Sequence, residues 1–420
     1  MKMKKAITLT LLSLLFASSI QASDWPQFLG PDRTGYSSEA DLNREWPESG
    51  PPILWSINVG EGFGAASIFK GRVYMLDRED NQSDVLRCFD LKSGEELWRF
   101  AYDAPGRLSY NGSRSTPTVT ETSIYTVGPF GHASCFSQET KKLVWSKSLQ
   151  TDFGATPPNW GFSQSPLLYE DMVIVAPMSD KHGLVALKKE TGDIVWSTPS
   201  IKGDSYTSPA LEILDGVEQV LMLTQGQLTS VNPQDGKILW TYDWYCKIPI
   251  PNPTRIDDNK LFVSGGYDAG SVLVQVSKEN GSWSVKELNK IEKKGAQIHP
   301  IILHNDHLYA NFNTNENLRR NPEGLTCLDL EGNIIWQRKD DPPIDRGAIL
   351  IAGDLLLAMG GQDGVLHLMQ IDPKGFKELA SSKVFDLEKD RGNDIWGLMA
   401  LSDGMLVVRS QNQMKCLKLK

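Results

Sequence analysis

Short apolar and alternating runs, separated by turn residues, follow one another along the chain. Residues 66–100 are typical: ASIFKGRVYML, then VLRCFDL, the turn KSGE, and ELWRF. Such runs predict short, partly buried β-strands joined by tight turns. Helical periodicity is absent beyond the first 22 residues. The pattern therefore predicts an all-β protein.

One unit of this pattern recurs. The stretch CFDLKSGEELW (88–98) ends on a tryptophan, and related stretches end at regular intervals after it. Aligning their last positions with the tryptophan of ILW near the N-terminus gives eight anchors: Trp55, Trp98, Trp145, Trp196, Trp240, Val285, Trp336 and Leu379. Their spacings are 43, 47, 51, 44, 45, 51 and 43 residues. Four short strands in each such unit predict the blades of a β-propeller.

A glycine stands four residues before most anchors, where a tight turn between the third and fourth strands requires positive φ. These glycines are Gly94, Gly192, Gly236, Gly281, Gly332 and Gly375, and Lys141 takes the place in one unit. A large ring at a fixed register predicts packing between blades rather than ligand binding. The predicted docking residues are Trp55, Trp98, Trp145, Trp196, Trp240 and Trp336.

The two ends of the repeat complement each other. Residues 51–59 (PPILWSINV) form a tryptophan strand without partners, whereas residues 395–420 supply three strands and stop before a tryptophan strand. Together they complete one blade and leave no open edge. We therefore predict an eight-bladed β-propeller over residues 51–420, closed by N- and C-terminal strands that share the last blade, with residues 23–50 as an N-terminal extension.

Residues 1–22 have the layout of a secretory signal peptide: lysines, a short apolar run and small residues before Ser23. A retained anchor is the alternative, but the apolar run is short for a span of about 20 residues. We expect a periplasmic or secreted protein without a membrane span after cleavage.

The mature chain has 40 Lys and Arg against 52 Asp and Glu, a net charge of −12, because the leader carries three lysines and no acid. That balance disfavours nucleic acid and anionic lipid as partners, and we expect a monomer.

An exported chain often uses its cysteines in disulfides. Here four of the five, Cys88, Cys135, Cys327 and Cys416, fall at one register of the repeat, and Cys246 stands apart. We therefore favour buried free thiols that pack as small apolar groups.

The small residue, Asp, Gly and Trp at Cys88, Asp90, Gly94 and Trp98 resemble the tryptophan-docking motif of the pyrroloquinoline-quinone-like (PQQ-like) β-propeller repeat proteins. The resemblance covers about residues 24–420, and DWPQFLGPDRTGYS, DFGATPPNWGFSQSP and SGGYDAGSVLVQVS are similar to phrases of short exported bacterial members. That family includes quinone-dependent alcohol dehydrogenases and the lipoprotein propeller of the outer-membrane assembly machine. The resemblance implies the fold and leaves the activity open.

In the dehydrogenases of that family an adjacent Cys pair lies beneath the quinone, acidic residues bind Ca²⁺ and an Asp acts as base. This chain has no adjacent Cys pair, and none of the other catalytic positions can be placed. We therefore predict no catalytic residue, no metal site and no cofactor. PQQ with Ca²⁺ is expected only under the alternative hypothesis, a quinoprotein-type alcohol or sugar dehydrogenase.

In a propeller of this kind, the loops that enter the first strand of each blade emerge on one face of the ring. Loops on a rigid scaffold are where binding residues concentrate. Nine residues in these loops are predicted to bind a protein partner or a small ligand: Tyr110, Arg114, Trp160, Ser163, Tyr206, Tyr267, His299, Arg346 and Trp396. Arginine beside aromatic rings suits an anionic ligand or a peptide segment. The alternative is that these side chains only pack the loops. The prediction is an exported, non-catalytic binding protein.

Overall fold

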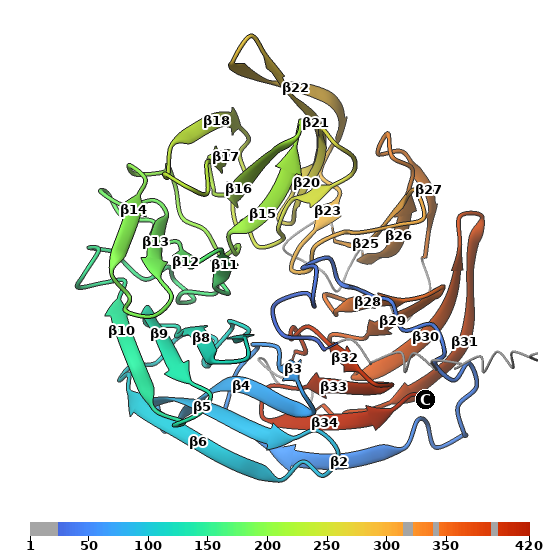
Figure 1. Ribbon diagram of the computed structural model, residues 1–420. Coiled ribbons are helices and arrows are strands. Elements are labelled where there is room, and N and C mark those ends of the chain that lie inside the picture. The colour runs from blue at the N-terminus through green and yellow to red at the C-terminus, as the bar shows by residue number, and fades with distance from the viewer. Residues whose placement is uncertain (1–23, 314–321, 339–343, 388–393) are drawn as a thin grey trace, which may run out of the picture.

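The computed structural model describes residues 24–313, 322–338, 344–387 and 394–420, and the predicted signal peptide lies outside them. These residues form eight sheets arranged as blades around a central channel (Figure 1). The regular elements of the described part are all strands, which confirms the predicted all-β class. Within it, no helix has the length and hydropathy needed to cross a membrane.

The first strand of each blade lines the channel and the fourth lies at the rim (Figure 1). Blade 1 consists of β3 (Ser67–Phe69), β4 (Arg72–Glu79), β5 (Ser83–Asp90) and β6 (Glu96–Asp103). Blade 2 consists of β7 (Thr118–Val119), β8 (Ser123–Val127), β9 (His132–Ser137) and β10 (Leu143–Ser148). Blade 3 consists of β11 (Leu167–Tyr169), β12 (Met172–Val175), β13 (Val185–Lys188) and β14 (Ile194–Ser197). Blades 4 and 5 consist of β15 (Ala210–Leu214), β16 (Val217–Leu223), β17 (Gln227–Val231), β18 (Ile238–Asp243); and β19 (Thr254–Arg255), β20 (Lys260–Gly265), β21 (Gly270–Glu279), β22 (Ser282–Ile291).

Blade 6 has a divided first strand, because two short strands both pair with its second strand. Its elements are β23 (Gly295–Ala296), β24 (Ile302–His304), β25 (His307–Asn313), β26 (Pro322–Leu328) and β27 (Ile334–Gln337). Blade 7 consists of β28 (Ile349–Ala352), β29 (Leu355–Met359), β30 (Val365–Asp372) and β31 (Gly375–Lys383).

Blade 8 is built from both ends of the described chain, which confirms the predicted closure. Its first three strands are β32 (Ala400–Ser402), β33 (Met405–Arg409) and β34 (Gln413–Lys418), and its fourth is β2 (Ile53–Asn58). Trp55 of β2 lies opposite Cys416 of β34 in the antiparallel register. The ring is therefore closed by main-chain hydrogen bonds, and no blade of the described part lacks a fourth strand.

Each conserved position of the repeat has one structural role. The small residue of the third strand faces the tryptophan of the fourth, as in Cys88 and Trp98, and a bulge precedes each of these tryptophans. The same pairing holds at Cys135, Ala186, Ser230, Cys327 and Cys416, opposite Trp145, Trp196, Trp240, Trp336 and Trp55. A small side chain leaves room for the indole across the strand, so the two residue types occur together.

Four of the six tryptophans donate a hydrogen bond to the turn of the next blade. Trp55 Nε1 donates a hydrogen bond to the Leu91 carbonyl at 2.8 Å, in the turn before Gly94. Trp145, Trp196 and Trp336 donate in the same way to the carbonyls of Lys189, Pro233 and Asp372. A Cβ at Gly94 would lie 2.6 Å from the Trp55 ring. Glycine is required at position 94 for two reasons: the backbone has a φ of +73°, and the Trp55 ring leaves no room for a Cβ.

Two tryptophans depart from this arrangement. Trp98 meets Lys141 instead of a glycine, and the Lys141 ammonium lies 5.6 Å from the indole centroid and donates to the Gln138 carbonyl. Lys141 adopts the positive φ of the turn, +60°. Trp240 instead donates to Gln219 Oε1 within its own blade, at 2.7 Å. In the turn of blade 2, Lys141 can replace glycine because its ammonium binds the Gln138 carbonyl, the turn carbonyl that accepts a hydrogen bond from the indole in other blades.

The two anchors without tryptophan were wrong. In blade 5 the residue after the bulge is Asn289, opposite Leu273, and not Val285. In blade 7 it is Ala380, opposite Leu368, and not Leu379. Blade 5 differs because the hairpin of β21 and β22 extends beyond the ring (Figure 1), which places its turn glycine farther from the bulge.

All five cysteines are buried free thiols, which confirms the predicted packing role. Burial raises the pKa of Cys88 and of Cys135 to about 11. A thiol is nucleophilic only as the thiolate, so these groups are inert at neutral pH.

The N-terminal extension crosses the channel rather than lying outside the ring. Trp25 forms an isolated bridge with Ile68 of blade 1, with both backbone hydrogen bonds at 2.8 Å. Farther along, β1 (Tyr36–Ser37) adds to β28 of blade 7 as a parallel strand. The segment is therefore fixed by main-chain pairing on two blades.

Between these attachments, Arg33 ties the extension to blades 3 and 4. Its guanidinium donates to the carbonyls of Pro166 and Pro209 at 3.2 and 3.1 Å and lies 5.5 Å from the centre of the Phe28 ring. Burial lowers the pKa of Arg33 to about 10. The segment therefore lies across the channel, with hydrogen bonds to blades 1, 3, 4 and 7.

The glycine contact can be tested with a matched pair of variants. Gly94→Ala places a methyl group at positive φ and into the Trp55 ring, whereas Gly281→Ala has a similar φ of +83° and meets nothing within 4 Å. We expect Gly281→Ala to cost about 1 kcal/mol of unfolding free energy. Gly94→Ala should cost about 1–3 kcal/mol more, because the indole must move. Equal losses in denaturant unfolding would contradict the docking role.

The closure can be tested by removing residues 411–420, which deletes β34. Three side chains of this strand, Met414, Cys416 and Leu417, have no exposed surface, and its removal separates β2 from β33, which keeps only β32 as a neighbour. We expect the truncated protein to melt at least about 10 °C lower than the full chain. An unchanged melting temperature in calorimetry would contradict the shared blade.

Candidate functional site

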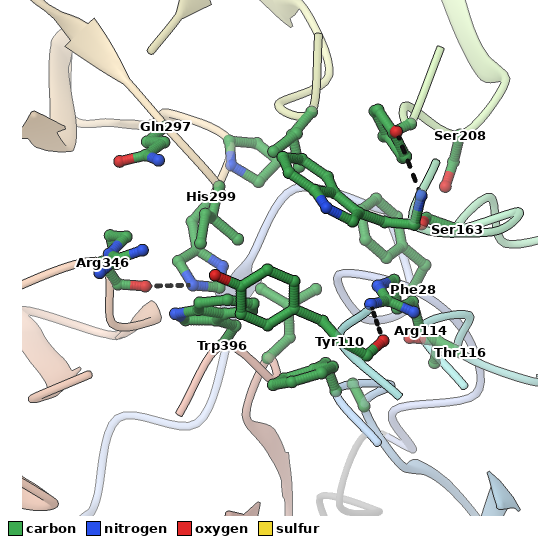
Figure 2. A pocket seen from close by; sticks show the side chains of 18 of the residues that line it. Phe28, Tyr110, Arg114, Thr116, Ser163, Ser208, Gln297, His299, Arg346 and Trp396 are labelled. Atoms are coloured by element: carbon green, nitrogen blue, oxygen red, sulfur yellow. Dashed lines mark hydrogen bonds between the residues drawn. The ribbon is translucent and has the colours of Figure 1, made fainter. Parts of the chain in front are cut away.

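A cavity opens at the channel mouth on the loop-rich face (Figure 2). It encloses about 980 Å³, including the open space at its mouth. All nine residues predicted for this face lie in its wall. Their convergence is a fact of the structure, and their role in binding stays a prediction.

The wall is built from one register position repeated around the ring. Arg114, Ser163, Tyr206 and Trp396 each stand four residues before the first strand of their blade. His299 and Arg346 stand three residues before β24 and β28. The four-residue offset also brings Phe63 of blade 1 and Ile250 of blade 5 into the wall, and sequence reasoning missed both. Their offset was readable from the repeat, but their apolar side chains gave no sign of a site.

Three further wall residues lie in the loops, outside this register position. Tyr110 and Trp160 belong to the loops before β7 and β11, and Tyr267 follows β20 at a φ of +55°. Phe28, from the N-terminal extension, also lines the cavity and was not predicted. Its contribution depends on the crossing of the channel, which no local pattern in the sequence reveals.

Aromatic rings form a continuous arc along the wall. Phe63 and Trp396 stack with their centroids 4.7 Å apart, and Tyr110 lies 5.2 Å from Trp396. Tyr110 is perpendicular to Trp160 at 6.1 Å, and Trp160 is 5.2 Å from Tyr206. Rings held by neighbouring rings lose little further freedom when a ligand packs on them.

Arg114 lies at one end of this arc and is largely withdrawn from solvent. Its guanidinium donates to the carbonyls of Gly112 and Tyr110 and lies 5.2 Å from the centre of the Phe63 ring. Burial lowers the pKa of Arg114 to about 10, opposed by the nearby Tyr206 hydroxyl. The side chain stays charged at neutral pH, and no carboxylate contributes to this balance.

The opposite side of the cavity carries Gln297, His299 and Arg346 (Figure 2). His299 Nε2 lies 3.2 Å from the Arg346 carbonyl, which can only accept, so Nε2 carries the proton. Burial lowers the pKa of His299 to about 4, so the ring is neutral at neutral pH. Arg346 lies 5.4 Å from the centre of the Trp396 ring.

This fold and channel-mouth cavity define a closed eight-bladed propeller with docked tryptophans. Residues 81–338 match the family model described as "Outer membrane protein assembly factor BamB", which is more than half of the chain. The chain belongs to this family of PQQ-like propellers.

Relatives include both an enzyme and an assembly factor. The quinoprotein alcohol dehydrogenase PedH of Pseudomonas putida is 23% identical over 164 residues, a match that spans 37% of this chain and only 27% of that enzyme. The quinohemoprotein alcohol dehydrogenase of Comamonas testosteroni superposes with a TM-score of 0.64 at 12% identity, over 96% of this chain and 81% of that one. BamB of Moraxella catarrhalis gives 0.56 at 13% identity, over 88% and 98%. These structural likenesses show the fold alone.

The cavity does not fit PQQ bound with Ca²⁺. Calcium takes oxygen ligands, mainly from carboxylates, and none of the described residues in the wall is Asp or Glu. Across the described ranges, no group of three or more His, Cys, Asp and Glu side chains is arranged to hold a metal ion.

The protonation state of His299 can be tested by measuring the free energy of unfolding at different pH values. Its folded pKa of about 4 lies below the unfolded value near 6.5, so the unfolded chain binds the proton first as pH falls. The contribution of neutral His299 should therefore be complete above about pH 6.5 and be lost toward pH 4. We expect the stability difference between wild type and His299→Gln to shrink by more than about 1 kcal/mol between pH 7 and pH 4. A pH-independent difference in urea unfolding would contradict the buried neutral imidazole.

Proposed function

We propose that this chain is an exported, non-catalytic β-propeller that binds a ligand at the mouth of its channel. The ligand is either a small molecule or a segment of a protein partner. The observation that carries this proposal is the cavity itself, whose wall draws residues from every blade and joins an aromatic arc to two arginines. Concave sites lined by apolar and aromatic side chains with a few convergent polar groups are typical of ligand pockets.

The N-terminal sequence and the relatives support the proposed location. Residues 1–22 have the composition of a signal peptide, and the matching family model is described as an outer membrane protein assembly factor. Both support export to the periplasm or beyond. N-terminal sequencing of the protein recovered from the periplasm should then start near Ser23.

A quinoprotein dehydrogenase is the second candidate, favoured by the match to PedH. Against it stand the wall without described carboxylates and a sequence without an adjacent Cys pair. Hydride chemistry in such enzymes belongs to the cofactor. A protein that cannot hold the cofactor would therefore lack the reaction.

We expect that adding PQQ and Ca²⁺ to the mature protein produces no shifted absorption band and no alcohol-dependent dye reduction. The control is the same assay on an authentic quinoprotein dehydrogenase. Stoichiometric quinone binding with turnover would overturn the non-catalytic proposal.

The binding role is tested with an unselected extract. Mature protein should enrich a compound or a protein from the periplasm of its source by equilibrium dialysis or pull-down with mass spectrometry, and Arg114→Gln should lose most of that enrichment. Arg99→Ala is the control, because Arg99 pairs with Glu79 on the exposed surface of blade 1, away from the cavity. Equal recovery by wild type and Arg114→Gln would remove the cavity from the proposal.

A further inference from the structure

The two sides of the cavity favour different chemical groups on a single ligand. Arg114 and the hydroxyl-bearing Thr116, Ser163 and Ser208 lie on one side, and Gln297 and His299 lie on the other, with Tyr110 between them (Figure 2). The first group belongs to blades 2, 3 and 4 and the second to blade 6 and its entering loop. A ligand that touches both sides must therefore span the channel axis.

The Arg114 side favours an anion. A guanidinium has five N–H donors, and two of its nitrogens donate to carbonyls of its own loop. The charge is otherwise desolvated against Phe63, and the described wall contains no carboxylate to compensate it. A carboxylate on the ligand supplies the missing charge through paired hydrogen bonds.

The two acceptors on the Gln297 side favour hydrogen-bond donors on the ligand. Arg346 lies on the same side, and its charge is balanced within the protein because its Nε lies 3.8 Å from Asp345 Oδ1. Gln297 is 3% exposed, lines the cavity, and its Oε1 is buried without a hydrogen-bond partner in the part of the chain that is described. Since His299 Nε2 is protonated, its Nδ1 is an acceptor. A buried acceptor left unpaired costs about 1–3 kcal/mol, so ligand O–H or N–H groups are favoured at this side.

The middle of the cavity is apolar. Tyr110, Trp160 and Trp396 line it with aromatic faces and edges, and Phe28 of the crossing segment also lines it. A polymer that threaded the channel would have to pass this segment. The cavity therefore accepts a small molecule or the end of a chain.

We propose that the cavity binds an acidic saccharide by its end, an inference that rests on the proposed binding function. The carboxylate of the terminal sugar binds Arg114, sugar hydroxyls donate to Gln297 Oε1 and His299 Nδ1, and the apolar CH faces of the rings pack on the aromatic arc. A flat aromatic acid satisfies Arg114 and the rings but leaves both acceptors unpaired. A neutral sugar leaves the guanidinium uncompensated. An acidic sugar is the class that meets all three demands.

The test is calorimetric titration of wild-type mature protein with digalacturonic acid, its dimethyl ester, benzoate and tetra-alanine. Digalacturonic acid should bind saturably with a Kd of about 1 mM or tighter. The ester should bind about ten- to a hundred-fold more weakly, because it loses the charge-assisted hydrogen bonds. Since the ester comparison uses unaltered protein, it stands even if a variant misfolds.

Variants then show which side of the cavity binds the carboxylate and which side binds the sugar hydroxyls. Arg114→Gln should weaken digalacturonic acid about as much as esterification does, and it should no longer distinguish the acid from the ester. Gln297→Met, of similar shape, should weaken both compounds about tenfold, and Arg99→Ala should change neither. Melting curves of all variants provide the check on folding.

Three outcomes overturn the proposal: equal binding of acid and ester, tighter binding of benzoate, or binding of tetra-alanine alone, which would assign the cavity to a peptide carboxylate. If no probe binds while the periplasmic extract yields a ligand that depends on Arg114, the saccharide is wrong and the binding function stands. If neither yields one, both are wrong.

Discussion

The contact between the tryptophan of one blade and the turn of the next is the interaction on which the ring depends. It combines burial of an indole, a hydrogen bond such as that from Trp55 to the Leu91 carbonyl, and a turn glycine that permits close approach. A propeller blade cannot bury both faces of its sheet alone, so each repeat is stabilised by its neighbours. Closure of the ring by β2 and β34 extends the same contact to the last blade.

This arrangement separates stability from function. The docking contacts lie toward the rim, in β6, β10, β14 and their equivalents, whereas the loops that enter the first strands meet at the channel mouth. Residues such as Arg114 and Trp396 therefore lie outside the docking contacts and are held in position by the ring. The crossing N-terminal segment lies across the channel and adds Phe28 to the wall of the cavity. Variation at the mouth can then change the ligand without changing the fold, as in other scaffolds that carry function on loops.

The repeat was sufficient to predict the eight blades and their closure, because register, turn glycines and docking tryptophans are local in sequence. It failed at Val285 and Leu379, where the tryptophan is lost and hairpin length varies. Six of the nine wall residues could be predicted because they are polar or aromatic at a countable offset before a strand, and Tyr110, Trp160 and Tyr267 because they are aromatic residues in loops of the same face. Phe28 was not, since its place depends on pairing between β1 and β28, more than 300 residues apart. Nothing in the sequence alone marks the unpaired Gln297 Oε1, which is a property of tertiary packing.

The proposed function depends most on the cavity as the place of binding. A crystal structure of the mature protein grown with the ligand fraction from its own periplasm tests this most directly. We expect ligand density between the aromatic arc and the side of Gln297, with an anionic group in hydrogen-bond contact with the Arg114 guanidinium. Ligand density on another surface, with only ordered water between Arg114 and Gln297, would contradict it.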